Sequence, residues 1–195
     1  MKKLILKTAL ITFACILAVL LVLVTAMTML APRTMSEFFD GLGGERASLW
    51  YMELSWRKFG DTDDLTELFA KSADAEDYER VEKYGRELSG REDFARICAS
   101  QDAGGAEIAF YDYVCGNTAE AIFKNGDAAG AVEFAAAHTD DGYPPYNALQ
   151  TLLYADGAKN DGALLASLKI ALEKLSETGG AELQADLGYL NGLLK

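Results

Sequence analysis

Histidine and cysteine are scarce in this 195-residue chain, and their scarcity excludes several kinds of metal and catalytic site. The single histidine, His138, cannot complete a zinc site with cysteines at the usual spacing, and the chain contains no Cys-x-x-Cys motif. Gly-x-Ser-x-Gly motifs and glycine-rich phosphate loops are absent as well. We therefore predict no cofactor and no bound metal, and we interpret His138 as a packed or half-exposed side chain rather than a general base.

Basic residues are few once the N-terminal stretch is left out. All 30 acidic residues follow Met35, whereas four of the 18 basic residues precede Thr34, so the rest of the chain carries 14 − 30 = −16 formal charges. Such a surface repels phosphate backbones, so we predict no nucleic-acid partner. The charge also argues against the body lying flat on anionic lipid.

Charged residues are missing altogether from Ala9 to Ala31. A helix over this range would be ~35 Å long, enough to cross a hydrocarbon core of ~30 Å. A cleaved signal peptide is the alternative, with residues 24–26 as its cleavage site. We favour an uncleaved transmembrane anchor because the apolar character continues beyond that site to Ala31.

The flanking charges predict the orientation of the anchor. Three lysines precede the apolar run, whereas a single Arg33 follows it, together with Glu37 and Asp40. The positive-inside tendency then keeps the N-terminus in the cytoplasm. We expect a single-pass protein of the cell membrane whose C-terminal body is extracytoplasmic.

Four segments follow from this pattern. Glycines at 41, 43 and 44 indicate a spacer between the membrane and the body. The predicted segments are a cytoplasmic basic N-terminus (1–8), a transmembrane helix (9–31), a juxtamembrane linker (32–46) and a helical-repeat domain with a C-terminal capping helix (47–195).

Apolar residues in the body recur at helical spacing. Leu49, Met52, Trp56 and Phe59 follow one another at steps of three and four, and similar runs recur up to Leu194. Helix-ending glycines and helix-starting aspartates separate these runs. No sustained alternation indicates strands, so we predict an all-α fold with about nine short helices in the body.

The joints between helices recur at steps of about 30 to 36 residues. Gly60-Asp61 and Gly126-Asp127 lie 66 residues apart with Gly90 between them, and a fourth joint lies near Asn160. At these joints the chain resembles the tetratricopeptide-repeat (TPR) family, most closely at the second Gly-Asp pair. The resemblance implies a short α-solenoid of stacked helical hairpins over roughly residues 47–175. The residues that carry it, at turn and packing positions, are Phe59, Gly60, Asp61, Gly90, Ala119, Phe123, Gly126, Asp127, Ala131 and Phe134.

Two cysteines lie in the body, and one, Cys15, lies in the apolar run. Outside the cytoplasm Cys98 and Cys115 could form a disulfide, which would stabilise the fold by ~3 kcal/mol on the chain-entropy model. We favour the alternative, two small buried side chains on neighbouring helices.

Three short patterns resemble catalytic or metal-binding motifs but have a simpler structural interpretation. Ser55-x-x-Lys58 matches one element of penicillin-interacting enzymes, but its companion elements are missing. Residues 61–64 and 138–142 carry carboxylates that could bind calcium, yet neither run has the twelve-residue loop with a closing glutamate. We interpret their aspartates as helix caps and solvated turns.

The function that fits these features is recognition rather than catalysis. We expect a membrane-anchored helical-repeat module that binds a protein or peptide as a scaffold or adaptor. The alternative is a cell-envelope hydrolase that uses paired carboxylates on a helical scaffold. No spacing among the acids singles out such a pair.

Overall fold

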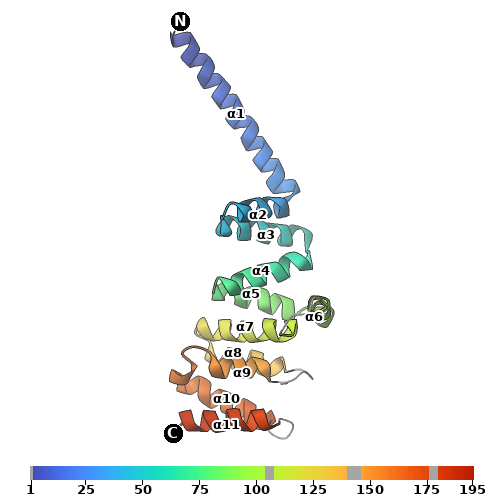
Figure 1. The fold of residues 1–195 in the computed structure, drawn as a ribbon, viewed down its shortest axis with the longest axis vertical. Helices are drawn as coiled ribbons and strands as arrows, with labels where there is room; N and C mark the ends of the chain where they lie inside the picture. The colour runs from blue at the N-terminus through green and yellow to red at the C-terminus, as the bar shows by residue number, and fades with distance from the viewer. Residues whose placement is uncertain (1, 104–107, 140–145, 176–179) are drawn as a thin grey trace. The chain divides into compact units, whose positions relative to one another are not determined.

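The structure, a computed structural model, describes residues 2–103, 108–139, 146–175 and 180–195 (Figure 1). Over these ranges the chain forms eleven α-helices and one short 3-10 helix, with no strand, which confirms the all-helical prediction. The helices are α1 Lys2–Leu30, α2 Pro32–Gly41, α3 Glu45–Phe59, α4 Thr62–Asp74, α5 Tyr78–Ser89, α6 Phe94–Asp102, α7 Phe110–Lys124, α8 Ala128–Ala137, α9 Asn147–Tyr154, η1 Ala158–Asn160, α10 Gly162–Leu175 and α11 Ala181–Leu193. The chain divides into two compact units, Met1–Leu68 and Phe69–Lys195.

Helix α1 has the length and the composition of a membrane span. Its segment Leu10–Leu30 has 21 residues, and none of its most apolar stretch is buried inside the molecule. At ~1.5 Å per residue this segment is ~32 Å long. A transmembrane anchor and a signal sequence share these properties, so both interpretations of the N-terminus remain compatible with the helix.

The break between α1 and α2 falls at Ala31 because Pro32 follows it. Proline has no backbone N–H and disfavours helical geometry in the preceding residue, and Ala31 accordingly has φ −143° and ψ 61°. At the first position of a new helix the same proline is well tolerated, and α2 begins there.

The segment expected as a spacer, 32–46, is largely folded. Helix α2 packs along α3, and its Ser36 side chain is buried between the two helices. The Ser36 hydroxyl donates to the Ser48 carbonyl oxygen at 2.9 Å and lies 3.0 Å from the Ser48 hydroxyl. Glycines 41, 43 and 44 lie at the turn between these helices. The packed helices that follow α1 therefore begin at Pro32 rather than at Ala47.

The second unit is built around α7. This helix contacts α5, α8 and α9, and α10 in turn contacts α8 and α11 (Figure 1). From Glu45 onward the described residues form nine α-helices, the number expected from the apolar spacing. Large side chains from these helices fill the interior, among them Leu88, Ile122, Leu149 and Leu168, which are fully buried.

The last helix, α11, buries Leu183, Leu187 and Leu190, whereas Glu182 and Gln184 are exposed. Asp186 on the same helix is also buried, at 4% exposed. Its carboxylate accepts hydrogen bonds from two side chains of α9, so burial of this charge is compensated by specific partners.

Candidate functional site

The turn between α7 and α8 brings together six of the ten residues that carry the TPR resemblance. Gly126 has φ +95°, a left-handed conformation that favours glycine. The Asp127 carboxylate then caps α8 by accepting a hydrogen bond of 2.8 Å from the backbone N–H of Gly130. Ala119 on α7 and Ala131 on α8 are both fully buried, as small residues between two contacting helices should be.

Two further residues of this set lie on either side of the turn. Phe123 is half-buried near the end of α7, and Phe134 is buried on α8. The Phe134 ring stacks on the His138 ring with centroids 4.1 Å apart, and the Arg86 guanidinium lies 5.5 Å from its centroid. The His138 Nδ1 lies 2.8 Å from the Phe134 carbonyl oxygen. The histidine therefore has a packing role, in agreement with its interpretation from the sequence.

The other predicted joints differ from one another. Gly60 ends α3 with φ +68°, and Asp61 accepts a hydrogen bond of 3.0 Å from the Asp63 backbone N–H. Phe59 beside it is 57% exposed. Gly90 caps α5 with φ −80°, a right-handed conformation open to any residue, so only two of the three glycines are required by backbone geometry.

A second set of glycines, missed at the sequence level, lies where helices approach most closely. A Cβ on Gly85 of α5 would lie 2.9 Å from the Thr118 Cβ of α7. A Cβ on Gly116 of α7 would lie 2.9 Å from the Thr151 Oγ of α9. The two glycines are 31 residues apart and the two threonines 33. The same helix-to-helix contact is thus made twice at the expected repeat length.

Both threonines in these contacts bond to their own helices. The Thr118 hydroxyl donates to the Val114 carbonyl oxygen at 2.6 Å, and the Thr151 hydroxyl donates to the Asn147 carbonyl oxygen at 3.0 Å. Each threonine hydroxyl is hydrogen-bonded within its own helix, so it needs no hydrogen-bond partner from the helix that carries the glycine.

The two cysteines of the body are both buried. Cys98 lies on α6 and Cys115 on α7, two helices in contact, and their exposed fractions are 5% and 1%. The structure holds both as thiols. The two side chains are thus buried on neighbouring helices.

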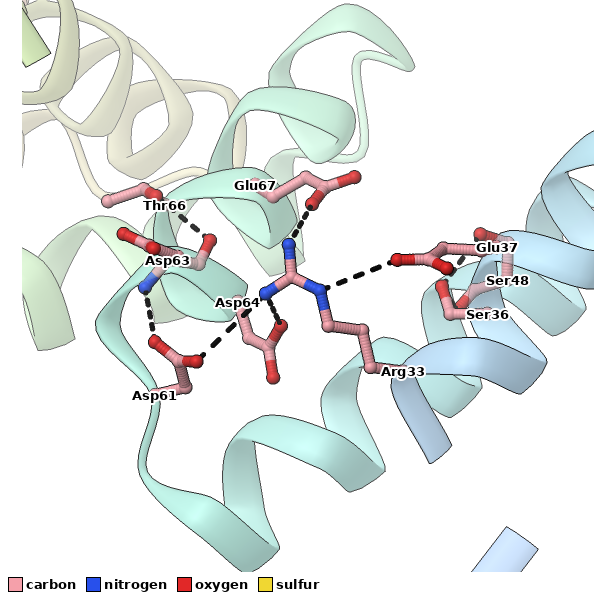
Figure 2. Close-up of polar contacts among 9 residues, drawn as sticks. All are labelled: Arg33, Ser36, Glu37, Ser48, Asp61, Asp63, Asp64, Thr66 and Glu67. Atoms are coloured by element: carbon pink, nitrogen blue, oxygen red, sulfur yellow. Dashed lines mark hydrogen bonds and ion pairs between the residues drawn. The ribbon is translucent and has the colours of Figure 1, made fainter. Parts of the chain in front are cut away.

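The first unit contains an ion cluster around Arg33 (Figure 2). The guanidinium binds the Asp64 carboxylate at 2.8 Å, and carboxylate oxygens of Glu37, Glu67 and Asp61 lie 3.6, 3.8 and 4.0 Å from its nitrogens. Burial disfavours the charged form of Arg33, but the four carboxylates outweigh it and raise the pKa of Arg33 above its ordinary value.

The cluster changes the interpretation of the acidic run 61–64. Asp61 caps α4, as expected, but the Asp64 side chain is only 1% exposed and binds Arg33. Within the described residues no group of three or more His, Cys, Asp or Glu side chains is placed so that it could hold a metal ion. The second acidic run is only partly described, because residues 140–142 lie outside the described ranges.

An aromatic and acidic pair lies on α9 and α11 of the second unit. The Tyr154 hydroxyl donates to one Asp186 carboxylate oxygen at 2.6 Å, and the Gln150 amide donates to the other at 3.0 Å. The Tyr154 ring stacks on the Tyr189 ring, and both rings are largely exposed. The hydrogen bond to Asp186 raises the pKa of Tyr154 to about 12.

Ser55 and Lys58 have separate structural surroundings. Ser55 is 2% exposed in the first unit. The Lys58 amine donates to the Met29 carbonyl oxygen near the end of α1 and lies 5.1 Å from the centroid of the Phe59 ring. An amine engaged in this way stabilises a helix C-terminus.

Comparison with known proteins leaves these features to be interpreted on their own. No protein-family model matches the chain, and neither curated proteins nor solved structures give a match.

Proposed function

We propose that this chain is a membrane-anchored, extracytoplasmic TPR-like module that binds a protein or peptide partner as a scaffold or adaptor, without catalysis of its own. In this proposal α1 is an uncleaved anchor, and the helices that follow form a short α-solenoid of stacked hairpins.

The observation that carries the proposal is the serial contact of α5, α7 and α9. These are the first helices of successive hairpins if the joints at Gly90, Gly126 and Asn160 are the hairpin turns. Contact between α8 and α10 joins the second helices of the last two of these hairpins. Stacked hairpins of this kind bury a continuous core and present an extended surface, which repeat proteins use for recognition.

The charge of the body indicates the chemistry of the partner. An excess of 16 acidic residues beyond Thr34 attracts segments rich in lysine or arginine. Exposed aromatic rings such as Tyr154 and Tyr189 can add contacts with cationic side chains. The anchor then raises the local concentration of a weak binder at the membrane.

A pair of peptides tests the binding part of the proposal. Two fluorescent peptides share the same apolar residues, but one carries lysines where the other carries glutamates. We expect the lysine peptide to bind the full chain in detergent micelles, with an affinity that falls as salt is added. Fluorescence anisotropy measures both peptides. Equal anisotropy changes for the two peptides would remove the electrostatic basis of the proposal.

A matched pair of cysteine variants tests the topology. In intact cells a membrane-impermeant maleimide should label Lys195→Cys, whereas Lys7→Cys should be labelled only after the membrane is permeabilised. The native Cys98 and Cys115 should not react with the maleimide, because both side chains are buried. The reverse pattern of labelling would place the body in the cytoplasm.

A further inference from the structure

Four aromatic side chains of α2 and α3 form one contiguous group. The Phe39 ring stacks on the Tyr51 ring with centroids 5.3 Å apart and planes 8° apart. The Phe38 ring meets Phe39 edge-on at 5.5 Å, and the Trp50 ring meets Tyr51 edge-on at 4.8 Å. We call these four residues, with Leu42 directly after α2, the aromatic shelf.

Much of the aromatic shelf is exposed. Leu42 is 67% exposed, Phe38 57% and Trp50 52%. Such large apolar side chains, contiguous on a short helical pair, are typical of an interaction surface.

Contacts with α1 fix the depth of the aromatic shelf. The Tyr51 hydroxyl lies 3.4 Å from the Thr28 hydroxyl, and Lys58, two turns further along α3, donates to the Met29 carbonyl oxygen. Thr28 is two residues from the end of the apolar segment Leu10–Leu30, which corresponds to ~3 Å along the helix axis. The tyrosine hydroxyl is therefore level with the end of the segment that would span the hydrocarbon core.

The charge of this part of the chain differs from that of the rest. Residues 32–60 contain four basic and four acidic residues, so their formal charge is 4 − 4 = 0. Residues 61–195 contain 11 basic and 26 acidic residues, so theirs is 11 − 26 = −15. The repulsion from anionic lipid expected of the body therefore arises beyond residue 60, and α2 and α3 carry no net charge that opposes contact with headgroups.

We propose that the headgroup layer of the lipid bilayer covers the aromatic shelf and holds α2 and α3 against the membrane surface. Tryptophan and tyrosine are favoured at this depth because they combine an apolar ring with a polar hydrogen-bonding atom. The inference rests on the anchored state in the proposed function, since α1 must be in the bilayer to bring the shelf to its surface. A protein partner or a second copy of the chain is the competing occupant.

The test uses Trp50 as a depth probe in the full chain. The variant Trp56→Phe leaves Trp50 as the only tryptophan, because the chain has two. The control carries Trp50→Phe, Trp56→Phe and Ile170→Trp, which moves the single tryptophan to an exposed position on α10. Both proteins are reconstituted into vesicles of phosphatidylcholine and phosphatidylglycerol, with and without bromine on the upper acyl chain.

We expect brominated lipid to reduce Trp50 emission at least twofold and to leave the control emission unchanged. Equal emission in the two kinds of vesicle would overturn the inference, and a blue shift of Trp50 that depends on protein concentration would assign the shelf to a second copy instead. Flotation of the same vesicles in alkaline carbonate separates the two levels of the argument. Chain lost from the vesicles contradicts the anchor and with it the inference, whereas retained chain with unquenched Trp50 contradicts the shelf alone.

Discussion

Arg33 shows how one side chain can join two helices of the first unit, α2 and α4. It lies on α2, and its strongest partner, Asp64, lies 31 residues away on α4. The Asp64 carboxylate is almost completely withdrawn from water, so the loss of its cation would leave a buried charge without compensation. The Arg33 side chain is 44% exposed, and solvent screening reduces the energy of the pair.

Arg33→Ala is expected to lower the free energy of unfolding of the first unit by about 1–2 kcal/mol. Urea titration of the full chain in detergent micelles measures this change through tryptophan fluorescence, because Trp50 and Trp56 both lie on α3. Arg57→Ala is the matched control, since Arg57 pairs with Glu53 at 2.6 Å but is 62% exposed. It should cost no more than about 0.5 kcal/mol. Equal losses in both variants would contradict a special role for Arg33.

Tyr154 should titrate later than an ordinary tyrosine. Its neutral hydroxyl donates to Asp186, and ionisation would place two negative charges in contact, so its pKa is raised to about 12 from an ordinary 10.0. The stability that this bond contributes is complete below pH ~10 and is lost as the pH rises through about 12. NMR of ring-labelled tyrosine measures the pKa. Asp186→Asn should bring it back toward the ordinary value, and an unchanged pKa would refute the assignment.

At the scale of elements, the second unit depends on close approach between helices. Gly85 and Gly116 allow α7 to lie near α5 on one side and α9 on the other. A methyl group at Gly85 would clash with Thr118 of α7, and one at Gly116 would clash with Thr151 of α9. Gly188 of α11 has open space around its Cβ position.

Gly85→Ala is expected to destabilise the second unit by about 1–2 kcal/mol, because overpacking outweighs the gain in helix propensity. Gly188→Ala should instead stabilise it by about 0.5–1 kcal/mol, since the helix gains without a clash. Melting curves followed by circular dichroism at 222 nm give both changes. A higher melting temperature for Gly85→Ala would show that α5 and α7 are not closely packed there.

The cysteines of α6 and α7 give a chemical test of the same packing. We expect Cys98 and Cys115 to resist a thiol reagent in the folded protein and to react fully after unfolding without reductant. Mass spectrometry counts the modified cysteines. If the two resist the reagent even after unfolding, until a reductant is added, they form a disulfide.

At the scale of the whole molecule, the sequence predicts structure that depends on neighbouring residues and misses contacts between residues that are far apart in the chain. Nine helices of the body follow from apolar residues three and four apart, because helical spacing is a local property. The Arg33 cluster, the burial of Asp186 and the fold of α2 depend on partners that lie 12 to 36 residues away. The glycine–threonine contacts have a sequence signal, their repeat spacing, which becomes evident only once the packing is known.

The folded state of α2 determines how far α3 and α4 can move from the end of α1. If residues 32–46 were a flexible linker, their ends would lie roughly 20 Å apart on average. Hydrogen bonds join α2 to α3 through Ser36 and to α4 through Arg33, so the three helices cannot move independently as a flexible linker would allow. Helices α3 and α4 therefore stay close to the end of α1, and a molecule that binds to them must approach that end of α1.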